Sequence, residues 1–304
     1  MEVLNVSKQA FHQMLKRSQY RKEEQQQLLP LINEIRRDHP RMSARDMYIK
    51  LRPSIMGRDQ FEKFCFDSGY RVKRLKNYRV TTNSQGVTRF PNKIKDIKLT
   101  GVNQVFVSDI TYFEIGSRFY YLTLIMDLFN REIVGWSASE NLRTEYTTLP
   151  ALHRLIWERG KSNLDGAIIH SDGGGQYYCK EFKCLTNSLK MINSMTEETV
   201  YENSHAERLN GIIKNNYLYP YGPKDLYSLR KLLDKAVLMY NTGKPHKALG
   251  KLTPKSYLIN ATIDNENNSQ KSYFPLPTVN HIHTLDNEII NKKVNVILSF
   301  HDID

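Results

Sequence analysis

The amino-acid sequence predicts an α/β protein in which a mixed sheet flanked by helices follows a small all-helical region. Two observations lead to this prediction. The first is a change of periodicity near residue 100, with short helical patterns before it and strand patterns after it. The second is the order of the later segments, in which three adjacent strands joined by short turns precede alternating helices and strands. This order is typical of a sheet with helices packed on its faces.

Residues 1–70 contain short helical segments with recognisable start and stop signals. Ser7 can cap the first helix, and the second covers about residues 25–38. Ser43 can cap a third helix, and Gly57 precedes a fourth. Short helices joined by tight turns resemble a helix-turn-helix module, the type that places one helix in the major groove of DNA. We therefore expect this region to bind DNA.

Residues 71–99 form a basic linker. From Tyr70 to Leu99 the chain has nine Lys or Arg against one acid, Asp96, and shows neither a helical nor a strand period. We interpret this stretch as an extended arm that lies along phosphates, because each phosphate that a cation neutralises releases counterions. The alternative is a solvated charge run that contacts nothing. The DNA-binding residues that this interpretation predicts are Arg71, Lys73, Arg74, Lys76 and Arg79.

The core is expected over residues 100–258. Its strands are predicted near residues 104–112, 117–126, 131–138, 166–171 and 191–195, and its helices near residues 144–159, 178–189, 203–216 and 228–240. Residues 259–304 contain Asn-rich and strand-like pieces that do not continue this pattern, and we assign them no role.

The net charge of +12 is concentrated in the first third of the chain. Residues 1–99 have 22 Lys and Arg against 10 Asp and Glu, so the remaining residues are neutral overall. A basic segment ahead of a neutral domain indicates a polyanion such as DNA as the partner. The alternative is a basic surface that only improves solubility.

Several classes of protein and site are disfavoured. No segment has the roughly 18 consecutive apolar residues of a membrane span, and the N-terminus lacks the apolar core of a signal peptide, so we expect no membrane association and a cytoplasmic, nucleoid-associated location. Cys65, Cys179 and Cys184 are too few and too irregularly spaced for a disulfide framework or a zinc site. The run 173–175 is glycine-rich but lacks the Gly-Lys-Ser/Thr ending of a phosphate-binding loop.

Three carboxylates occupy positions from which they can meet. Asp109 closes an alternating strand pattern, and Asp172 closes a second apolar run just before three glycines. Glu207 lies on a helix, in a polar stripe with Asn203, Asn210 and Lys214. An all-carboxylate set favours Mg²⁺ or Mn²⁺. Two such ions about 4 Å apart suit the cleavage and transfer of a phosphodiester.

Two other residues near these acids have competing interpretations. Asp127 also ends an apolar strand, and we interpret it as structural, with a metal ligand as the alternative. His170 precedes Asp172 by two residues and can orient a metal ligand or a water, or simply pack within its strand.

Basic side chains follow the same helix and the next one. The candidates that steer DNA towards the acids are Arg208, Lys214, Lys244, His246 and Lys247. For Arg208 and Lys247 ordinary surface charge is an equal alternative.

Five segments occur in the order found in one family of mobile-element proteins. They are "VFVSDITYF", "YYLTLIMDLFNREIVGW", "IIHSDGGGQYY", "YENSHAERLNGIIK" and "YNTGKPHKALGKLTPKSY". Over roughly residues 5–257 the chain resembles insertion-sequence transposases with a retroviral-integrase-like catalytic core, specifically the downstream-frame product of the insertion sequence three family.

The resemblance implies an RNase H-like fold and a transposase that cleaves and joins DNA strands with two Mg²⁺ or Mn²⁺ ions. Asp109, Asp172 and Glu207 would be catalytic and hold the metal, and Lys214 would contact DNA. The implied partners are double-stranded DNA at element ends and target, further copies of the chain on that DNA, and an upstream-frame helix-turn-helix protein.

One departure from the family pattern concerns the third acid. Thirty-four residues separate Asp172 from Glu207, where the family usually has about thirty-five. The shortfall lies in the loop before the helix, where a change of one residue is well tolerated. The short spacing favours one alternative, a catalytically decayed copy that still binds DNA. The other alternative is another RNase H-like nuclease, which would not need a basic helical region and linker of this size.

Overall fold

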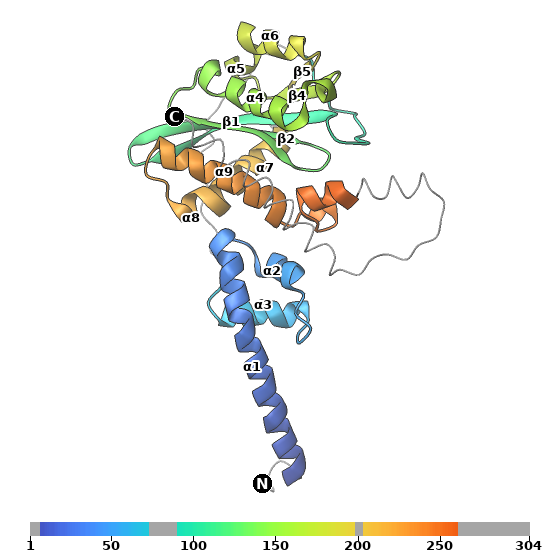
Figure 1. Cartoon of the computed structure of the whole chain (residues 1–304), viewed down its shortest axis with the longest axis vertical. Coiled ribbons are helices and arrows are strands. Elements are labelled where there is room, and N and C mark those ends of the chain that lie inside the picture. Colours follow the sequence, from blue (N-terminus) through green and yellow to red (C-terminus); the bar gives the residue numbers. More distant parts are fainter. Residues whose placement is uncertain (1–6, 73–89, 198–202, 261–304) are drawn as a thin grey trace, which may run out of the picture. The chain divides into compact units, whose positions relative to one another are not determined.

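The structure is a computed structural model, and it describes residues 7–72, 90–197 and 203–260 (Figure 1). Of the predicted linker residues, Lys73, Arg74, Lys76 and Arg79 lie outside the described residues, as does nearly all of 259–304.

The N-terminal region consists of α1 (Lys8–Asp38), α2 (Ala44–Leu51) and α3 (Arg58–Asp67). The predicted caps are confirmed at two of them: the Ser7 hydroxyl accepts a hydrogen bond from the Ala10 N–H, and the Ser43 hydroxyl accepts one from the Asp46 N–H. Apolar side chains from all three helices form a core of their own, in which Ile32, Met47 and Phe61 are fully buried. The chain is therefore helical over this region, as predicted.

The prediction of two separate helices before His39 was wrong. The structure joins them in α1, a single helix of 31 residues that contains Pro30. Residues 16–27 contain neither Gly nor Pro and consist largely of good helix formers, so no local signal ends the first helix. Pro30 is exposed, and so is Gln26, whose carbonyl loses its helical partner and can be hydrated instead.

The core contains a five-stranded mixed sheet in the order β3-β2-β1-β4-β5. The strands β1 (Val105–Ile115), β2 (Arg118–Asp127) and β3 (Ile133–Ser139) form an antiparallel meander. The strands β4 (Ile168–Ser171) and β5 (Ile192–Met195) extend the sheet beyond β1 and run parallel to it. The predicted RNase H-like mixed sheet is thus confirmed.

Helices cover both faces of this sheet (Figure 1). One face packs against α4 (Thr148–Arg159), α5 (Gly175–Tyr178) and α6 (Lys180–Ser188). The other packs against α7 (Ser204–Ile213), a π-helical turn (Lys214–Leu218) and α9 (Leu226–Gly243), with α8 (Tyr219–Tyr221) between the last two. The predicted helix 178–189 is divided at Cys179, whose backbone is extended. No helix among the described residues has the length and apolar character needed to cross a membrane.

Candidate active site

Asp109 lies in β1, and Asp172 directly follows the neighbouring parallel strand β4. Val107 of β1 is paired with His170 of β4, and each acid lies two residues further along its own segment. Because side chains alternate along a strand, the Asp109 carboxylate points to the face that α7 covers, and the charge of Asp172 acts on it. Adjacent strands are about 4.8 Å apart, so the sheet itself places these two acids side by side.

Gly174, two residues after Asp172, contacts the Asp172 carboxylate through its backbone. The Gly174 N–H donates a hydrogen bond to Oδ1 of Asp172 over 3.2 Å. A side chain at position 174 would bring its Cβ within 3.1 Å of that same oxygen. Glycine here therefore allows the backbone to hold the carboxylate without covering it.

Helix α7 brings its polar stripe against β1. Asn203 donates to the Ser108 carbonyl over 3.0 Å, and Asn210 donates to Oδ2 of Asp109 over 2.8 Å. Further along, the Lys214 ammonium donates to the Thr111 hydroxyl over 2.8 Å. The apolar side of the same helix, formed by Ala206, Leu209 and Ile213, is buried in the core. The helix is thus fixed in both position and rotation.

Glu207 lies one helical turn before Asn210 and so faces the same strand. Its side chain is exposed, which leaves its carboxylate free to reorient. Residues 198–202, in the loop that carries the one-residue shortfall, lie outside the described residues. The contacts of Asn203 and Asn210 nevertheless show that α7 packs along β1 with Glu207 near Asp109.

The electrostatics of Asp109 connect the three acids. Burial raises the pKa of Asp109 to about 8, and the negative charges of Asp172 and Glu207 raise it as well, whereas the hydrogen bond from Asn210 opposes the shift. Burial also raises the pKa of Asp172, and the Gly174 N–H opposes that shift. The arrangement therefore holds carboxylates together in a way that disfavours full ionisation without a cation.

The donor set suits a hard divalent ion. Its atoms are carboxylate oxygens, and the Asn210 Oδ1 beside them is buried with no hydrogen-bond partner among the described residues. Within residues 7–72, 90–197 and 203–260, no three His, Cys, Asp or Glu side chains are grouped closely enough to enclose a metal.

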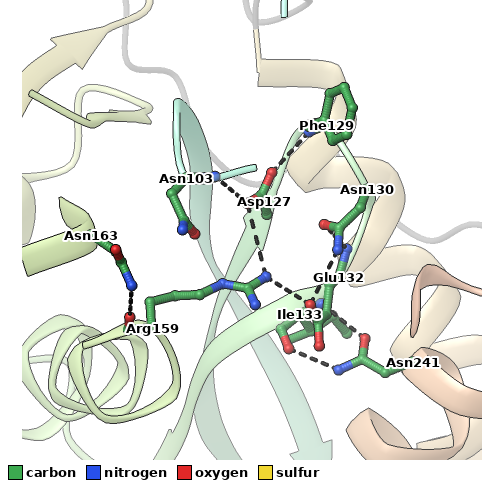
Figure 2. A network of polar contacts seen from close by, with 9 residues as sticks. All are labelled: Asn103, Asp127, Phe129, Asn130, Glu132, Ile133, Arg159, Asn163 and Asn241. Atoms are coloured by element: carbon green, nitrogen blue, oxygen red, sulfur yellow. Dashed lines mark hydrogen bonds and ion pairs between the residues drawn. The ribbon is translucent and has the colours of Figure 1, made fainter. Parts of the chain in front are cut away.

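Asp127 belongs to a separate network (Figure 2). Its carboxylate accepts hydrogen bonds from the Asn103 and Phe129 N–H groups over 2.8 and 2.9 Å, and Arg159 lies 3.8 Å away. Arg159 also pairs with Glu132 over 2.6 Å. Asp127 is paired with Phe106, three positions before Asp109, and its side chain therefore points to the opposite face of the sheet. This environment matches the structural role predicted for Asp127.

His170 is fully buried between β1 and β5. Its Nδ1 lies 2.9 Å from the Ser194 hydroxyl, which also accepts a hydrogen bond from the Lys93 N–H over 2.8 Å. The imidazole thereby links β4 to β5 and to the segment that leads into the sheet. Its predicted effect on a metal ligand or water remains a prediction.

The described basic residues make contacts within the protein. The Arg71 guanidinium lies 4.5 Å from the centre of the Phe66 ring. Burial lowers the pKa of Lys214, and the charge of Asp109 opposes that shift. Asn203 and Asn210 belonged to the predicted polar stripe, but nothing in the sequence assigned them a contact. The signal that could have predicted the contact of Asn210 is Asp109, a carboxylate on the strand that this stripe faces.

Two family models match the core. Both are described as integrase core domain, and they match residues 100–198 and 193–254. The chain is 28% identical to the "Insertion element IS600 uncharacterized 31 kDa protein" of Shigella sonnei, over 67% of this chain and 75% of that protein. It is 25% identical to "Transposase InsF for insertion sequence IS3A" of Escherichia coli (strain K12), over 62% of this chain and 66% of that protein.

Among solved structures, the HTLV-2 integrase catalytic core domain in complex with magnesium is 21% identical and matches 51% of this chain and 95% of that domain, with a TM-score of 0.42. The two family matches and the transposase relatives lead to one assignment: the chain belongs to the insertion sequence three (IS3) family of transposases, proteins of DNA transposition with an integrase core domain.

Proposed function

We propose that this chain cleaves DNA at the ends of an insertion sequence and joins those ends to a target, with Asp109, Asp172 and Glu207 as its catalytic residues. The observation that supports this most directly is the pKa of Asp109, raised to about 8 by burial and by the charges of the other two acids. Buried carboxylates of like charge are costly unless a cation or a reaction requires them. The catalytic core would span residues 100–258, behind a DNA-binding region at 1–70 and the linker at 71–99.

Asp109, Asp172 and Glu207 would hold two Mg²⁺ or Mn²⁺ ions. When bound, such ions activate the attacking oxygen and stabilise the leaving 3′-oxygen of a phosphodiester. The Asn210 amide would keep Asp109 oriented through Oδ2, and the Gly174 N–H would do the same for Asp172 through Oδ1.

The reaction would run in two steps at one site. In the first, water attacks the phosphorus at the element end, the bond to the 3′-oxygen breaks, and a 3′-hydroxyl and a 5′-phosphate are formed. In the second, that 3′-hydroxyl attacks a phosphodiester of the target, forms a new bond to phosphorus and displaces the target's own 3′-oxygen. Each step exchanges one phosphorus–oxygen bond for another, so no covalent protein intermediate is needed.

The partners of this reaction would be double-stranded DNA and further copies of the chain, because two element ends must be joined to one target. Lys214 and Arg71, with Lys73, Arg74, Lys76 and Arg79 outside the described residues, are the proposed DNA contacts. His170 would support Asp172 from within β4. An upstream-frame helix-turn-helix protein is the further proposed partner, and the cytoplasmic nucleoid is the proposed location.

The test is strand transfer from a precut duplex that mimics an element end. Wild type should give joined product in Mg²⁺ or Mn²⁺ and none in EDTA, and Asp109→Asn should give none. Asp165→Asn is the matched control, because Asp165 is an exposed acid paired with Lys190 over 3.1 Å. Binding without any cleavage by wild type would favour a decayed copy, and cleavage without joining would favour another nuclease of this fold.

A further inference from the structure

A second cluster of charged side chains lies beside the acids, and all of its members are basic. Arg131 occupies the turn between β2 and β3, Arg208 lies on α7, and Lys244 follows α9. The Arg131 guanidinium lies 3.0 Å from Nδ1 of His205, which is one helical turn before Arg208. Near Lys244, the His246 ring packs edge-on against Tyr240, with the ring centres 4.9 Å apart.

The charges of this cluster act on one another. Burial lowers the pKa of His246 to about 3, and the charges of Lys244, Arg131 and Arg208 lower it further. Burial also lowers the pKa of Lys244 and of Arg131, and in both cases Arg208 adds to the shift. Segments distant in the sequence thus bring the partly buried Arg131 and Lys244 together with the exposed Arg208, all of like sign.

No carboxylate neutralises these cations within the described part of the chain. Arg131, Arg208 and Lys244 form no ion pair with any described Asp or Glu. The charges of Asp46 and Asp127 reach the cluster from farther away, and Asp127 is engaged by backbone N–H groups. The Nε2 atom of His246 is buried and has no hydrogen-bond partner among the described residues.

Such a cluster is unfavourable in the free protein, since desolvated cations without a counterion repel each other. A bound anion would remove this cost. A phosphate offers several acceptor oxygens and suits the fork of an arginine. The chemistry of the cluster is therefore that of a phosphate site.

The position of the cluster indicates which phosphate it would bind. Arg208 directly follows Glu207 on α7, so the cluster borders the acids on one side, while Lys214 lies about 10 Å along the helix on the other. DNA carries a phosphate for each nucleotide of each strand, about 3.4 Å apart along the axis. A strand cut at the acids would therefore continue past the cluster.

We propose that Arg131, Arg208 and Lys244 bind a backbone phosphate of the DNA strand adjacent to the phosphodiester being cut. This inference rests on the proposed function, since it assumes DNA at the three acids. The site would not distinguish one base sequence from another, because the phosphate groups are the same at every nucleotide. It would fix the register of the strand relative to Asp109, Asp172 and Glu207.

The experiment measures binding of the full-length protein to a labelled duplex of arbitrary sequence, in EDTA, over a range of salt concentrations. The double variant Arg208→Gln/Lys244→Gln should bind more weakly, and the slope of log K against log salt should fall by about 0.9 for each phosphate that the variant no longer neutralises. The matched control is Lys231→Gln/Lys235→Gln, which removes the same charge from exposed positions on α9 and should keep the wild-type slope.

A second measurement separates this role from a structural one. Without DNA, the double variant should melt at the same temperature as wild type or higher, because removing cations relieves their repulsion. The duplex should then raise the melting temperature of wild type more than that of the variant. An unchanged slope, or a lower melting temperature with unchanged binding, would overturn the proposal. EDTA prevents the reaction, so the binding measurement does not depend on catalysis. If wild type showed no strand transfer in Mg²⁺, the proposed function would be contradicted, but the binding result would stand.

Discussion

Asn210 of α7 donates a hydrogen bond from Nδ2 to Oδ2 of Asp109 over 2.8 Å. This contact joins residues that are 101 positions apart in the sequence and ties the helix that carries Glu207 to the central strand. The other amide atom, Oδ1, is buried without a partner among the described residues. Asn210 is therefore a positioning residue whose side chain costs stability unless the site uses it.

Asn210→Leu should accordingly separate activity from stability. Leucine fills a similar volume and removes an unsatisfied amide oxygen, but it also removes the hydrogen bond to Asp109, so the two effects oppose each other and the melting temperature should change little. The strand-transfer rate at fixed Mg²⁺ should fall about 10- to 100-fold, with more Mg²⁺ needed for half the maximal rate. Metal titrations of wild type and variant would show this. A variant that is destabilised but normally active per folded molecule would contradict the assignment.

The raised pKa of Asp109 predicts how stability depends on pH without metal. The folded pKa, about 8, lies above the unfolded value of about 3.9, so the folded state binds this proton more tightly. The contribution of Asp109 to the free energy of unfolding is therefore fully present below about pH 4 and is lost as the pH rises towards 8. Asp109→Asn removes this loss and should raise the melting temperature in EDTA at pH 8 by about 2–4 °C for each kcal/mol regained.

Melting curves in EDTA at pH 5 and pH 8 would test this expectation. The gain of Asp109→Asn over wild type should be larger at pH 8, and it should shrink when Mg²⁺ is added. Asp165→Asn, which alters an exposed acid, should show no such trend. Equal or lower stability of Asp109→Asn at pH 8 would mean that the burial and repulsion at this site are compensated by the protein itself.

Much of the fold follows from local pattern. The strands were predicted within a few residues because alternation is a property of neighbouring residues, and the end of β4 just before Asp172 is visible in the same way. The helix division before His39 was wrong because a cap at Ser7 says where a helix begins and nothing about where it ends. The continuation through Pro30 depends on its exposure, which only the structure gives.

The contacts around the site required the three-dimensional structure. The polar stripe on α7 was predictable, but its pairing of Asn210 with Asp109 depends on how the helix is rotated against β1. Likewise, Arg131 has a positive φ of 62°, which a turn imposes. Nothing in the sequence near Arg131 indicates that it lies with Arg208 and Lys244, because those segments meet only after folding.

Asp127→Asn should damage the fold more than the chemistry. The Asp127 carboxylate accepts two backbone N–H groups, and an asparagine amide placed there turns a donor towards one of them. The asparagine N–H and the backbone N–H would then face each other without an acceptor. Such buried, unsatisfied donors lower the free energy of unfolding by about 1–3 kcal/mol, so the melting temperature should fall by several degrees. At a temperature where the variant is folded, strand transfer per folded molecule should remain near wild type. Lost activity without lost stability would contradict a structural role.

The linker should contribute strongly to nonspecific DNA affinity. Replacing Arg71, Lys73, Arg74 and Lys76 by glutamine should flatten the dependence of log K on log salt by up to about 0.9 for each phosphate left without its cation. Cleavage of DNA that is already bound should change far less, because the chemistry is assigned to Asp109, Asp172 and Glu207. Salt titrations of binding, beside single-turnover cleavage at saturating protein, would separate the two effects. An unchanged slope would mean that the linker does not touch DNA.

Asp172→Asn should abolish cutting and joining together. The change removes a charge but keeps the size of the side chain, and the asparagine oxygen can still accept the Gly174 N–H, so folding and DNA binding should persist. One site performs both steps, with water and then a 3′-hydroxyl as the nucleophile, so each rate should fall by at least about 100-fold. The measurements are end cleavage on intact DNA and strand transfer from precut DNA, each in Mg²⁺ and in Mn²⁺. If Asp172→Asn left either reaction near wild type while Asp127→Asn abolished both, the catalytic acids would have to be reassigned around Asp127 on the opposite face of the sheet.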